Sequence, residues 1–98
     1  MQYNFEWDPQ KDRLNKAKYE VSFRLAATVF RDQNQLSVYD DEHSDHEDRW
    51  ATIGLDSGGI LRVIIHTFEQ VEAETIEIRI ISACKATREE SEQYYQGL

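Results

Sequence analysis

Residues 75–81 read Thr-Ile-Glu-Ile-Arg-Ile-Ile, and this alternation decides the fold class. Successive side chains of a strand point to opposite faces, so the isoleucines at positions 76, 78 and 80 share one face, with Glu77 and Arg79 on the other. Isoleucine and threonine also favour strands. The pattern predicts a strand whose apolar face packs against helices and whose polar face lines an open groove.

The residues before this strand predict an antiparallel sheet. Residues 36–39, 50–55 and 60–68 are rich in the Ile, Val and Thr that pleated surfaces favour. Residues 56–59 (Asp-Ser-Gly-Gly) supply the glycines of a tight hairpin turn. Residues 69–74 form a longer polar connection. We therefore expect the strands to pair as an antiparallel meander.

The first thirty residues predict one strand and two helices. Residues 3–7 alternate aromatic and polar side chains, as in a short half-buried strand. Asp8 and Pro9 suit the N-cap and first position of a polar helix over 11–18, and Ser22 suits the N-cap of a second helix. The second helix has an apolar stripe that should pack on the sheet, formed by Phe23, Ala26, Ala27, Val29 and Phe30.

The C-terminal residues predict a last helix. Thr87 with Glu90 three residues on forms a capping box, and this helix runs to Gly97. The element order is therefore β-α-α-β-β-β-β-α, without repeats or a linker. Because 98 residues suffice for one hydrophobic core but not two, we expect a single α+β domain over residues 1–98. Its small antiparallel sheet should carry the helices mainly on one face.

The charge is concentrated in one segment. The net charge is −8, but residues 40–48 contain six acids and no Lys or Arg, which leaves 13 acids and 11 bases elsewhere. An acidic protein gains nothing from counterion release on a polyphosphate, so the composition argues against a general nucleic-acid binder. We expect the acidic segment to be a mobile loop, or a surface on which a basic partner docks.

The sequence also predicts the compartment. No apolar run approaches the ~20 residues that a membrane span requires, and the N-terminus lacks the basic and apolar regions of a signal peptide. The single cysteine, Cys84, cannot form an internal disulfide, which suits a reducing compartment. We expect a cytoplasmic protein without membrane contact.

Four basic or His positions lie on or beside the expected strands, at Arg49, Arg62, His66 and Arg79. Arg62 and His66 should share a face because they are four residues apart in one strand. Cutting RNA by attack of a 2′-hydroxyl requires a proton acceptor, a proton donor and cations for the phosphorane, which His, Arg and Lys supply without metal. The alternative, favoured by residue types alone, is a hydrogen-bonded strand histidine and arginines paired with glutamates.

Other candidate groups have simpler interpretations. His43 and His46 lie among carboxylates, but their spacing matches no metal signature, so we expect neither a metal nor a cofactor. Cys84 is interpreted as a small buried residue rather than a reactive thiol. Tyr94 and Tyr95 are expected to pack the last helix on the sheet rather than stack on bases.

A longer set of residues, running from Phe5 to Tyr94, resembles one known family. In order, they are Phe5-Glu6-Trp7-Asp8-Pro9, Lys11, Asn15, Lys18, Val21-Ser22-Phe23, Ala26, Val29-Phe30, Asp41-Glu42-His43-Ser44, Arg49-Trp50, Ile53-Gly54, Gly59, His66-Thr67, Ile78-Arg79-Ile80-Ile81-Ser82-Ala83, Lys85-Ala86-Thr87-Arg88 and Tyr94. In identity, order and spacing these residues resemble the BrnT toxins.

The resemblance implies a RelE-like fold, ribonuclease activity that arrests translation, and neutralisation by a ribbon-helix-helix antitoxin. DNA would be contacted only indirectly, through that antitoxin. The resemblance also implies the site residues. Arg49 and Arg79 would hold the scissile phosphate, His66 would move the proton and Lys18 would add charge. The residues expected to contact RNA are Trp50, Lys85 and Arg88, to which the strand pattern adds Arg62.

The chain departs from the family pattern at two places. The family continues from Lys18 with His-Gly where this chain has Tyr19-Glu20, and it has Arg where this chain has Cys84. Each change removes a potential cation, and losing one charge-stabilising donor costs about a hundredfold in rate or more. The alternative hypothesis is therefore a weakened or inactive binding module that acts as antitoxin partner or corepressor.

Overall fold

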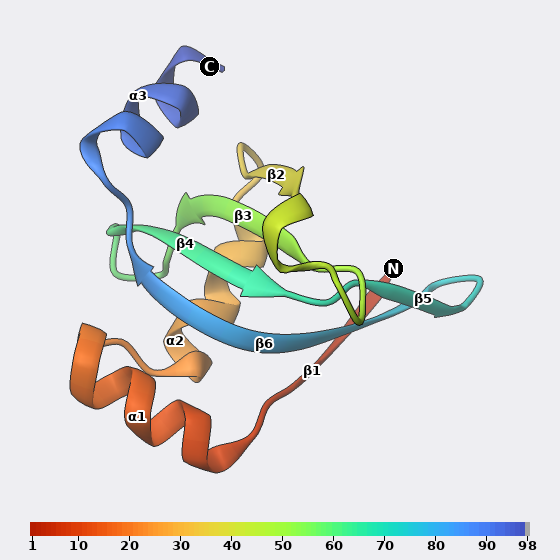
Figure 1. Ribbon diagram of the computed structural model, residues 1–98. Coiled ribbons are helices and arrows are strands. Elements are labelled where there is room, and N and C mark those ends of the chain that lie inside the picture. The colour runs from red at the N-terminus through yellow and green to blue at the C-terminus, as the bar shows by residue number, and fades with distance from the viewer. Residues whose placement is uncertain (98) are drawn as a thin grey trace.

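Strand β6 (Thr75–Lys85), the longest in the sheet, is central to the fold. The computed structural model describes residues 1–97 (Figure 1). The strand order is β1-β6-β4-β3-β2, with β5 also paired to β6. Only β1 runs parallel to its neighbour β6, so the expected antiparallel meander is confirmed for the strands after the helices.

The remaining elements follow the predicted order with one additional strand. They are β1 (Gln2–Glu6), α1 (Pro9–Tyr19), α2 (Phe23–Ala27), the 3₁₀ helix η1 (Thr28–Arg31), β2 (Leu36–Tyr39), the 3₁₀ helix η2 (Asp41–His43), β3 (Trp50–Leu55), β4 (Leu61–His66), β5 (Glu69–Glu72) and α3 (Arg88–Gln96).

The sheet has one face largely covered by helices, which we call the helix face. Helices α1, α2 and η1 lie on it, while α3 lies on the opposite face at one end of the sheet (Figure 1). The predicted alternation in β6 is confirmed, because its three isoleucines at 76, 78 and 80 are buried on the helix face. The core there consists of Val21, Phe23, Ala26, Val29, Ile64, Ile76, Ile78, Ile80 and Ala83.

The opposite face, which we call the α3 face, has a smaller core. Its buried members are Ile53, Val63 and Tyr94. The Tyr94 hydroxyl donates a 2.5 Å hydrogen bond to Asp32 Oδ2, which also accepts a 2.9 Å bond from the Leu55 amide. Helix α3 is thus tied to the sheet by Tyr94, which confirms the packing role expected of that residue, whereas Tyr95 is exposed.

One extra residue interrupts β6. Ile65 pairs with Ser82 but His66 pairs with Ile80, so Ile81 has no partner in β4. Such a bulge reverses the side-chain alternation of a strand. Ile80 and Ala83 therefore face the same core although they are three residues apart.

Helix α1 supplies a polar contact that replaces a neighbouring strand. The Asn15 side chain donates to the Ala83 carbonyl at 2.8 Å and accepts from the Ala83 amide at 3.1 Å. Asn15 is the buried residue of this helix, a role that the sequence pattern did not predict. Because the amide satisfies both backbone groups, β6 needs no strand at that edge.

Several local predictions are confirmed and one is wrong. The Asp8 and Ser22 N-caps and the capping box at Thr87 are present, and Gly59 has a φ of +82° in the β3–β4 turn. The polar stretch 69–74 was expected to be a connection, but Glu69–Glu72 pairs with β6 as β5. No helix among residues 1–97 is long and apolar enough to cross a membrane.

Candidate functional site

Arg62 and His66 share a face of β4, but that face is not an open groove. Both side chains are buried on the helix face, on either side of the core residue Ile64. The expectation that they line an open polar groove is therefore wrong. The prediction considered only the alternation within β4, whereas the covering of that face depends on helices that pack on Ile64.

Arg62 is held by the turn that precedes its strand. Its Nε donates to Asp56 Oδ2 at 2.9 Å, and Asp56 Oδ1 accepts from the amides of Gly58 and Ile60. Burial acts to raise the pKa of Asp56, but the hydrogen bonds from Arg62 and the two amides outweigh it, so the pKa lies below its ordinary value. Arg62 therefore has a structural partner in the core.

His66 is the inner end of a chain of hydrogen bonds. Its Nδ1 lies 2.8 Å from the Thr67 carbonyl, and its Nε2 lies 2.7 Å from Thr52 Oγ1. Thr52 Oγ1 in turn lies 2.7 Å from Ser37 Oγ on the edge strand β2. Phe30 packs its ring against the imidazole at a centroid distance of 4.9 Å. Burial lowers the pKa of His66, which keeps the imidazole neutral.

Arg79 and Arg49 meet at the acidic loop. Glu47 Oε1 accepts from Arg79 Nη2 and, at 3.4 Å, from Arg49 Nη2. The bond from Arg79 is the main reason that the pKa of Glu47 lies below its ordinary value. The Nε of Arg49 is buried and has no hydrogen-bond partner in the part of the chain that the structure describes. Two guanidinium groups are thus gathered around one anionic oxygen.

Arg79 and His66 lie on opposite faces of the sheet. Arg79 precedes Ile80 in β6, and Ile80 is the register partner of His66 on the helix face. Neighbouring strand residues point to opposite sides, so Arg79 points to the α3 face. The two side chains cannot contact one phosphate together.

The surroundings of Arg79 are acidic. A cavity of about 270 Å³ lies beside it. The lining residues are Glu6, Glu47, Asp48, Thr67, Phe68, Glu69, Glu77 and Arg79. Five of these eight side chains are carboxylates, so an incoming phosphate must displace negative charge before it reaches the guanidinium groups.

A less polar cavity lies at the same end of the sheet. It measures about 310 Å³ and is lined by Ser37, Trp50, His66 and Phe68. Phe68 also lines the cavity beside Arg79, so the two cavities adjoin. Tyr39 packs against Trp50 at a centroid distance of 5.3 Å with the rings nearly perpendicular.

The other expected site residues lie elsewhere. Lys85 pairs in register with Arg62, at the end of β4 remote from His66. Arg88 begins α3 beyond it and forms an exposed 3.5 Å ion pair with Glu92. Lys18 lies in the last turn of α1, with its Nζ 5.1 Å from the centre of the Tyr19 ring. The structure therefore brings Arg49, Trp50, His66 and Arg79 to one end of the sheet, although not to one face, and places Lys18, Lys85 and Arg88 elsewhere.

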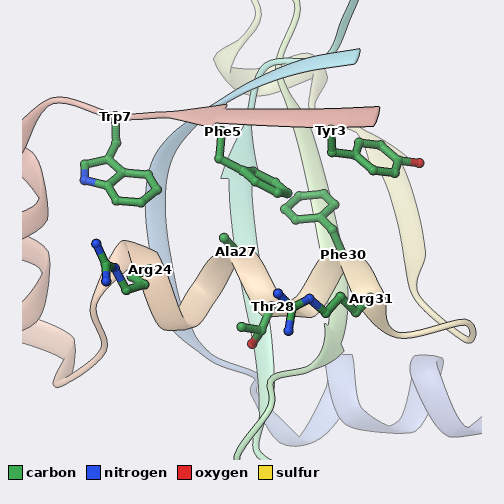
Figure 2. Close-up of a pocket in the computed structure, with 8 residues that line it drawn as sticks. All are labelled: Tyr3, Phe5, Trp7, Arg24, Ala27, Thr28, Phe30 and Arg31. Atoms are coloured by element: carbon green, nitrogen blue, oxygen red, sulfur yellow. The ribbon is translucent and has the colours of Figure 1, made fainter. Parts of the chain in front are cut away.

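Another aromatic cavity, of about 440 Å³, lies between β1 and the α2–η1 segment (Figure 2). Tyr3, Phe5 and Trp7 point from β1 toward the helices, and Phe30 packs on Phe5 at 5.4 Å. It lies on the helix face, since β1 pairs in register with the buried isoleucines of β6. The cavity is therefore separate from the α3 face that carries Arg79.

The acidic loop shows no cluster of metal ligands. His43 Nδ1 lies 3.0 Å from Asp40 Oδ2, and among residues 1–97 no three His, Cys, Asp or Glu side chains are arranged so that they could hold a metal ion. Cys84 is half-buried, and burial raises the pKa of its thiol. The structure thus offers the thiol no thiolate-stabilising setting.

Sequence patterns did not single out Glu47, Thr52, Ser37 or Phe68. Glu47 lies among five other acids, and its contact with Arg79 joins residues 32 apart. The one local signal is that Glu47 lies two residues before Arg49. Thr52 and Ser37 face each other across β2 and β3, which only the strand register reveals.

Comparison with known proteins finds a matching family model and similarity to a solved structure. A family model described as the ribonuclease toxin BrnT of type II toxin–antitoxin systems matches residues 7–90. The 1.1 Å crystal structure of the Brucella abortus ribonuclease toxin BrnT matches with a TM-score of 0.55 and 22% sequence identity, covering 90% of this chain and 100% of that chain. No curated protein matches. The structural match confirms the α+β fold, while the RelE-like label stays a prediction.

Proposed function

The chain belongs to the BrnT family of type II toxin–antitoxin ribonuclease toxins, and we propose that it is itself an endoribonuclease that cuts RNA without a metal ion and thereby inhibits translation. In this proposal it acts in the cytoplasm, and a ribbon-helix-helix antitoxin neutralises it. Contact with DNA occurs only through that antitoxin. Membership of the family supports the toxin role, and the arrangement of arginines supports the chemistry.

The observation that carries the proposal is the shared carboxylate between Arg49 and Arg79. Both guanidinium groups contact Glu47 Oε1, and their side chains stay 29% and 41% exposed. A group that binds one carboxylate oxygen at the surface can exchange it for a phosphate oxygen, which guanidinium forks also fit. The Nε of Arg49 has no hydrogen-bond partner among the described residues, so Glu47 does not occupy every donor of this guanidinium group.

The reaction follows from this geometry. The 2′-oxygen of the RNA attacks phosphorus, the bond from phosphorus to O5′ breaks, and the leaving O5′ takes up a proton from solvent water. The products are a 2′,3′-cyclic phosphate and a 5′-hydroxyl. Arg49 and Arg79 stabilise the negative charge of the phosphorane, so no metal is needed. The proton of the 2′-hydroxyl goes to Glu77, which lies on the same face of β6 as Arg79 and lines its cavity.

His66 takes a different role from the one expected of it. Its Nδ1 binds the carbonyl of Thr67. The Thr67 amide donates to the Arg79 carbonyl at 3.0 Å, and the Arg79 amide donates to the Thr67 hydroxyl at 3.0 Å. His66 therefore acts as a positioning residue for the strand segment that carries Arg79. It does not transfer the proton at the phosphate.

The experiment measures cleavage of single-stranded RNA by purified protein in excess chelator. We expect Arg49→Ala and Arg79→Ala each to reduce the rate by about a hundredfold or more, because each removes a charge-stabilising donor. Arg13→Ala, an exposed arginine of α1, is the matched control and should cleave normally. Loss of wild-type cleavage in chelator, or full activity of Arg79→Ala, contradicts the proposal.

A second candidate is the inactive binding module, which the five carboxylates around Arg79 favour. If wild-type protein cleaves no RNA, alone or with ribosomes, yet binds a ribbon-helix-helix protein tightly, the enzyme proposal fails and this candidate replaces it. Glu47→Gln distinguishes a restrained enzyme, whose arginines are blocked by this carboxylate, from a protein that has lost the activity. Neutralising this carboxylate should raise the cleavage rate of a restrained enzyme and leave a binding module inactive.

A further inference from the structure

We propose that the cavity between Trp50 and Phe68 binds one nucleobase of the RNA, and that Ser37 accepts a hydrogen bond from an amino group of that base. This inference rests on the proposed ribonuclease function and extends it to substrate selection. The cavity volume, about 310 Å³, lies at the small end of the ~300–1,000 Å³ range of ligand pockets. It suits a single planar ring system better than a longer ligand.

The walls of the cavity are suited to stacking. Bases stack on aromatic side chains without regard to sequence because every base has a π face. Trp50 is half-buried and is held in place by the edge-on contact with Tyr39. Phe68 is 46% exposed, so part of its ring is accessible to a ligand. A base between the two rings would cover both.

The direction of the buried hydrogen bonds determines what Ser37 offers. The Thr67 carbonyl can only accept, so the neutral His66 carries its proton on Nδ1 and donates there. Its Nε2 is then an acceptor, and the Thr52 hydroxyl must donate to it. Thr52 has used its proton, so the Ser37 hydroxyl donates to Thr52. Ser37 consequently presents only oxygen lone pairs to a ligand.

An acceptor on the wall selects for a donor on the ligand. Adenine, cytosine and guanine carry exocyclic amino groups that can donate to Ser37, whereas the same ring without that group makes no such bond. A site that binds a donor discriminates against an analogue that lacks it. The cavity is therefore a filter for bases with an amino group at their edge.

The cavity is also correctly placed for a substrate held by the arginines. Trp50 follows Arg49 directly in the chain, and adjacent side chains of a strand point to opposite faces. Phe68 lines both this cavity and the one beside Arg79. One nucleotide can therefore cross the end of the sheet, with its phosphate at Arg49 and Arg79 and its base beside Trp50.

The test uses the fluorescence of Trp50 in the full chain. Trp7 is the second of two tryptophans, so Trp7→Phe leaves Trp50 as the one indole. Adenosine 5′-monophosphate should quench this fluorescence, and purine riboside 5′-monophosphate, which lacks the amino group, should bind at least about tenfold more weakly. Ribose 5-phosphate has no base and should cause no quenching.

Ser37→Ala should leave the affinity for purine riboside 5′-monophosphate unchanged. It should reduce the affinity for adenosine 5′-monophosphate to the same value. Phe68→Ala should weaken both, and Tyr95→Ala, an exposed tyrosine of α3, should change neither. Equal affinity of wild-type protein for the two nucleotides overturns the role of Ser37. Circular dichroism of each variant confirms that it is folded.

The outcomes also separate this inference from the ribonuclease proposal. If the protein cleaves RNA but no nucleotide quenches Trp50, the base pocket is wrong and the enzyme stands. If adenosine 5′-monophosphate binds with the Ser37 dependence described above but no RNA is cleaved, the pocket stands and the ribonuclease proposal fails.

Discussion

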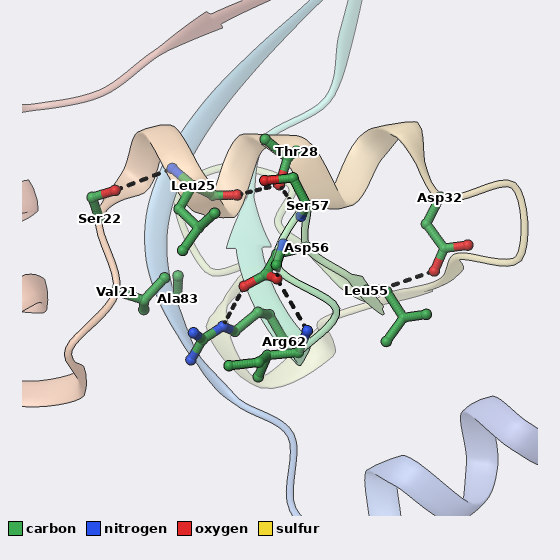
Figure 3. A network of polar contacts seen from close by, with 12 residues as sticks. Val21, Ser22, Leu25, Thr28, Asp32, Leu55, Asp56, Ser57, Arg62 and Ala83 are labelled. Carbon is green, nitrogen blue, oxygen red and sulfur yellow. Dashed lines mark hydrogen bonds and ion pairs between the residues drawn. The ribbon is translucent and has the colours of Figure 1, made fainter.

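Two arginine–carboxylate contacts in this protein have the same chemistry and opposite settings. Arg62 and Asp56 meet in the core, with side chains 8% and 0% exposed (Figure 3). Arg79 and Glu47 meet at the surface, where their side chains are 41% and 34% exposed. The buried carboxylate also accepts two backbone amides, whereas the surface carboxylate is shared with a second arginine.

The difference shows which contact can be exchanged. Removing one partner of a buried pair leaves a charge without water or a counter-ion, so the buried carboxylate is not exchanged for another anion. A surface pair gains little over its separately solvated members, so another anion can replace one of them. The same residue types therefore have a structural role in the core and, in the proposed function, a phosphate-binding role at the surface.

The largest expected effect is on the buried contact. Asp56→Ala leaves the guanidinium of Arg62 buried and unpaired and should lower the free energy of unfolding by about 3–5 kcal/mol, measured by urea denaturation. The double variant Asp56→Ala with Arg62→Met removes the buried charge as well and should recover part of this loss. A loss below about 1 kcal/mol in the single variant contradicts a structural role for the pair.

Tyr94→Phe should have the next largest effect. Burial and the neighbouring Asp32 raise the pKa of Tyr94 to about 12, so the phenol is protonated at neutral pH and donates to that carboxylate. Loss of a hydrogen bond to a charged acceptor should cost about 1.5–3 kcal/mol of unfolding free energy. Tyr95→Phe, at an exposed position of the same helix, is the control and should change stability little.

Mild acid should destabilise the protein through His66. Because burial lowers the pKa of His66, the unfolded chain takes up a proton near pH ~6.5 while the folded chain does not. Stability is therefore complete above about pH 6.5 and falls as the pH drops toward the folded-state pKa. The slope is at most about 1.4 kcal/mol per pH unit for one proton. Urea denaturation between about pH 5 and pH 7.5 measures it, and His66→Gln should flatten the curve.

The smallest effect on stability is expected at the surface contact. Arg79→Ala should change the free energy of unfolding by no more than about 0.5 kcal/mol. The pKa of Glu47 should rise toward its ordinary value, because the hydrogen bond from Arg79 is the main cause of its depression. An NMR titration of this carboxyl measures the change. A large loss of stability would place Arg79 with Arg62 as a structural residue.

Local patterns predicted most of the fold. The alternating isoleucines of β6, the capping box at Thr87 and the Gly59 turn all depend on residues close in sequence, and all are confirmed. Strand β5 was not predicted, because its sequence Glu-Gln-Val-Glu is polar and its pairing is determined by β6. Edge strands with charged side chains resemble loops in sequence.

The site depended on distant partners and was harder to predict. The shared face of Arg62 and His66 is confirmed, but the sequence does not show that helices cover it. Thr52 holds His66 from the neighbouring strand, and Glu47 reaches Arg79 from a loop 32 residues earlier. Side-chain partners of this kind are decided by register and packing rather than by residue type.

The unpaired Ile81 in β6 has a consequence for how the chain can evolve. The strand consists of two half-strands in opposite phase, one carrying Arg79 and the other anchored by Asn15 at Ala83. Deleting one residue at the junction would remove the bulge and make the register regular, so that Arg79 and Ala83 both keep their present faces. The bulge can therefore absorb a one-residue change in length without turning either half-strand. The two ends of the molecule can thus diverge separately, so that the end that carries Arg79, which we propose binds phosphate, can change while the packing of α1 on the sheet stays the same.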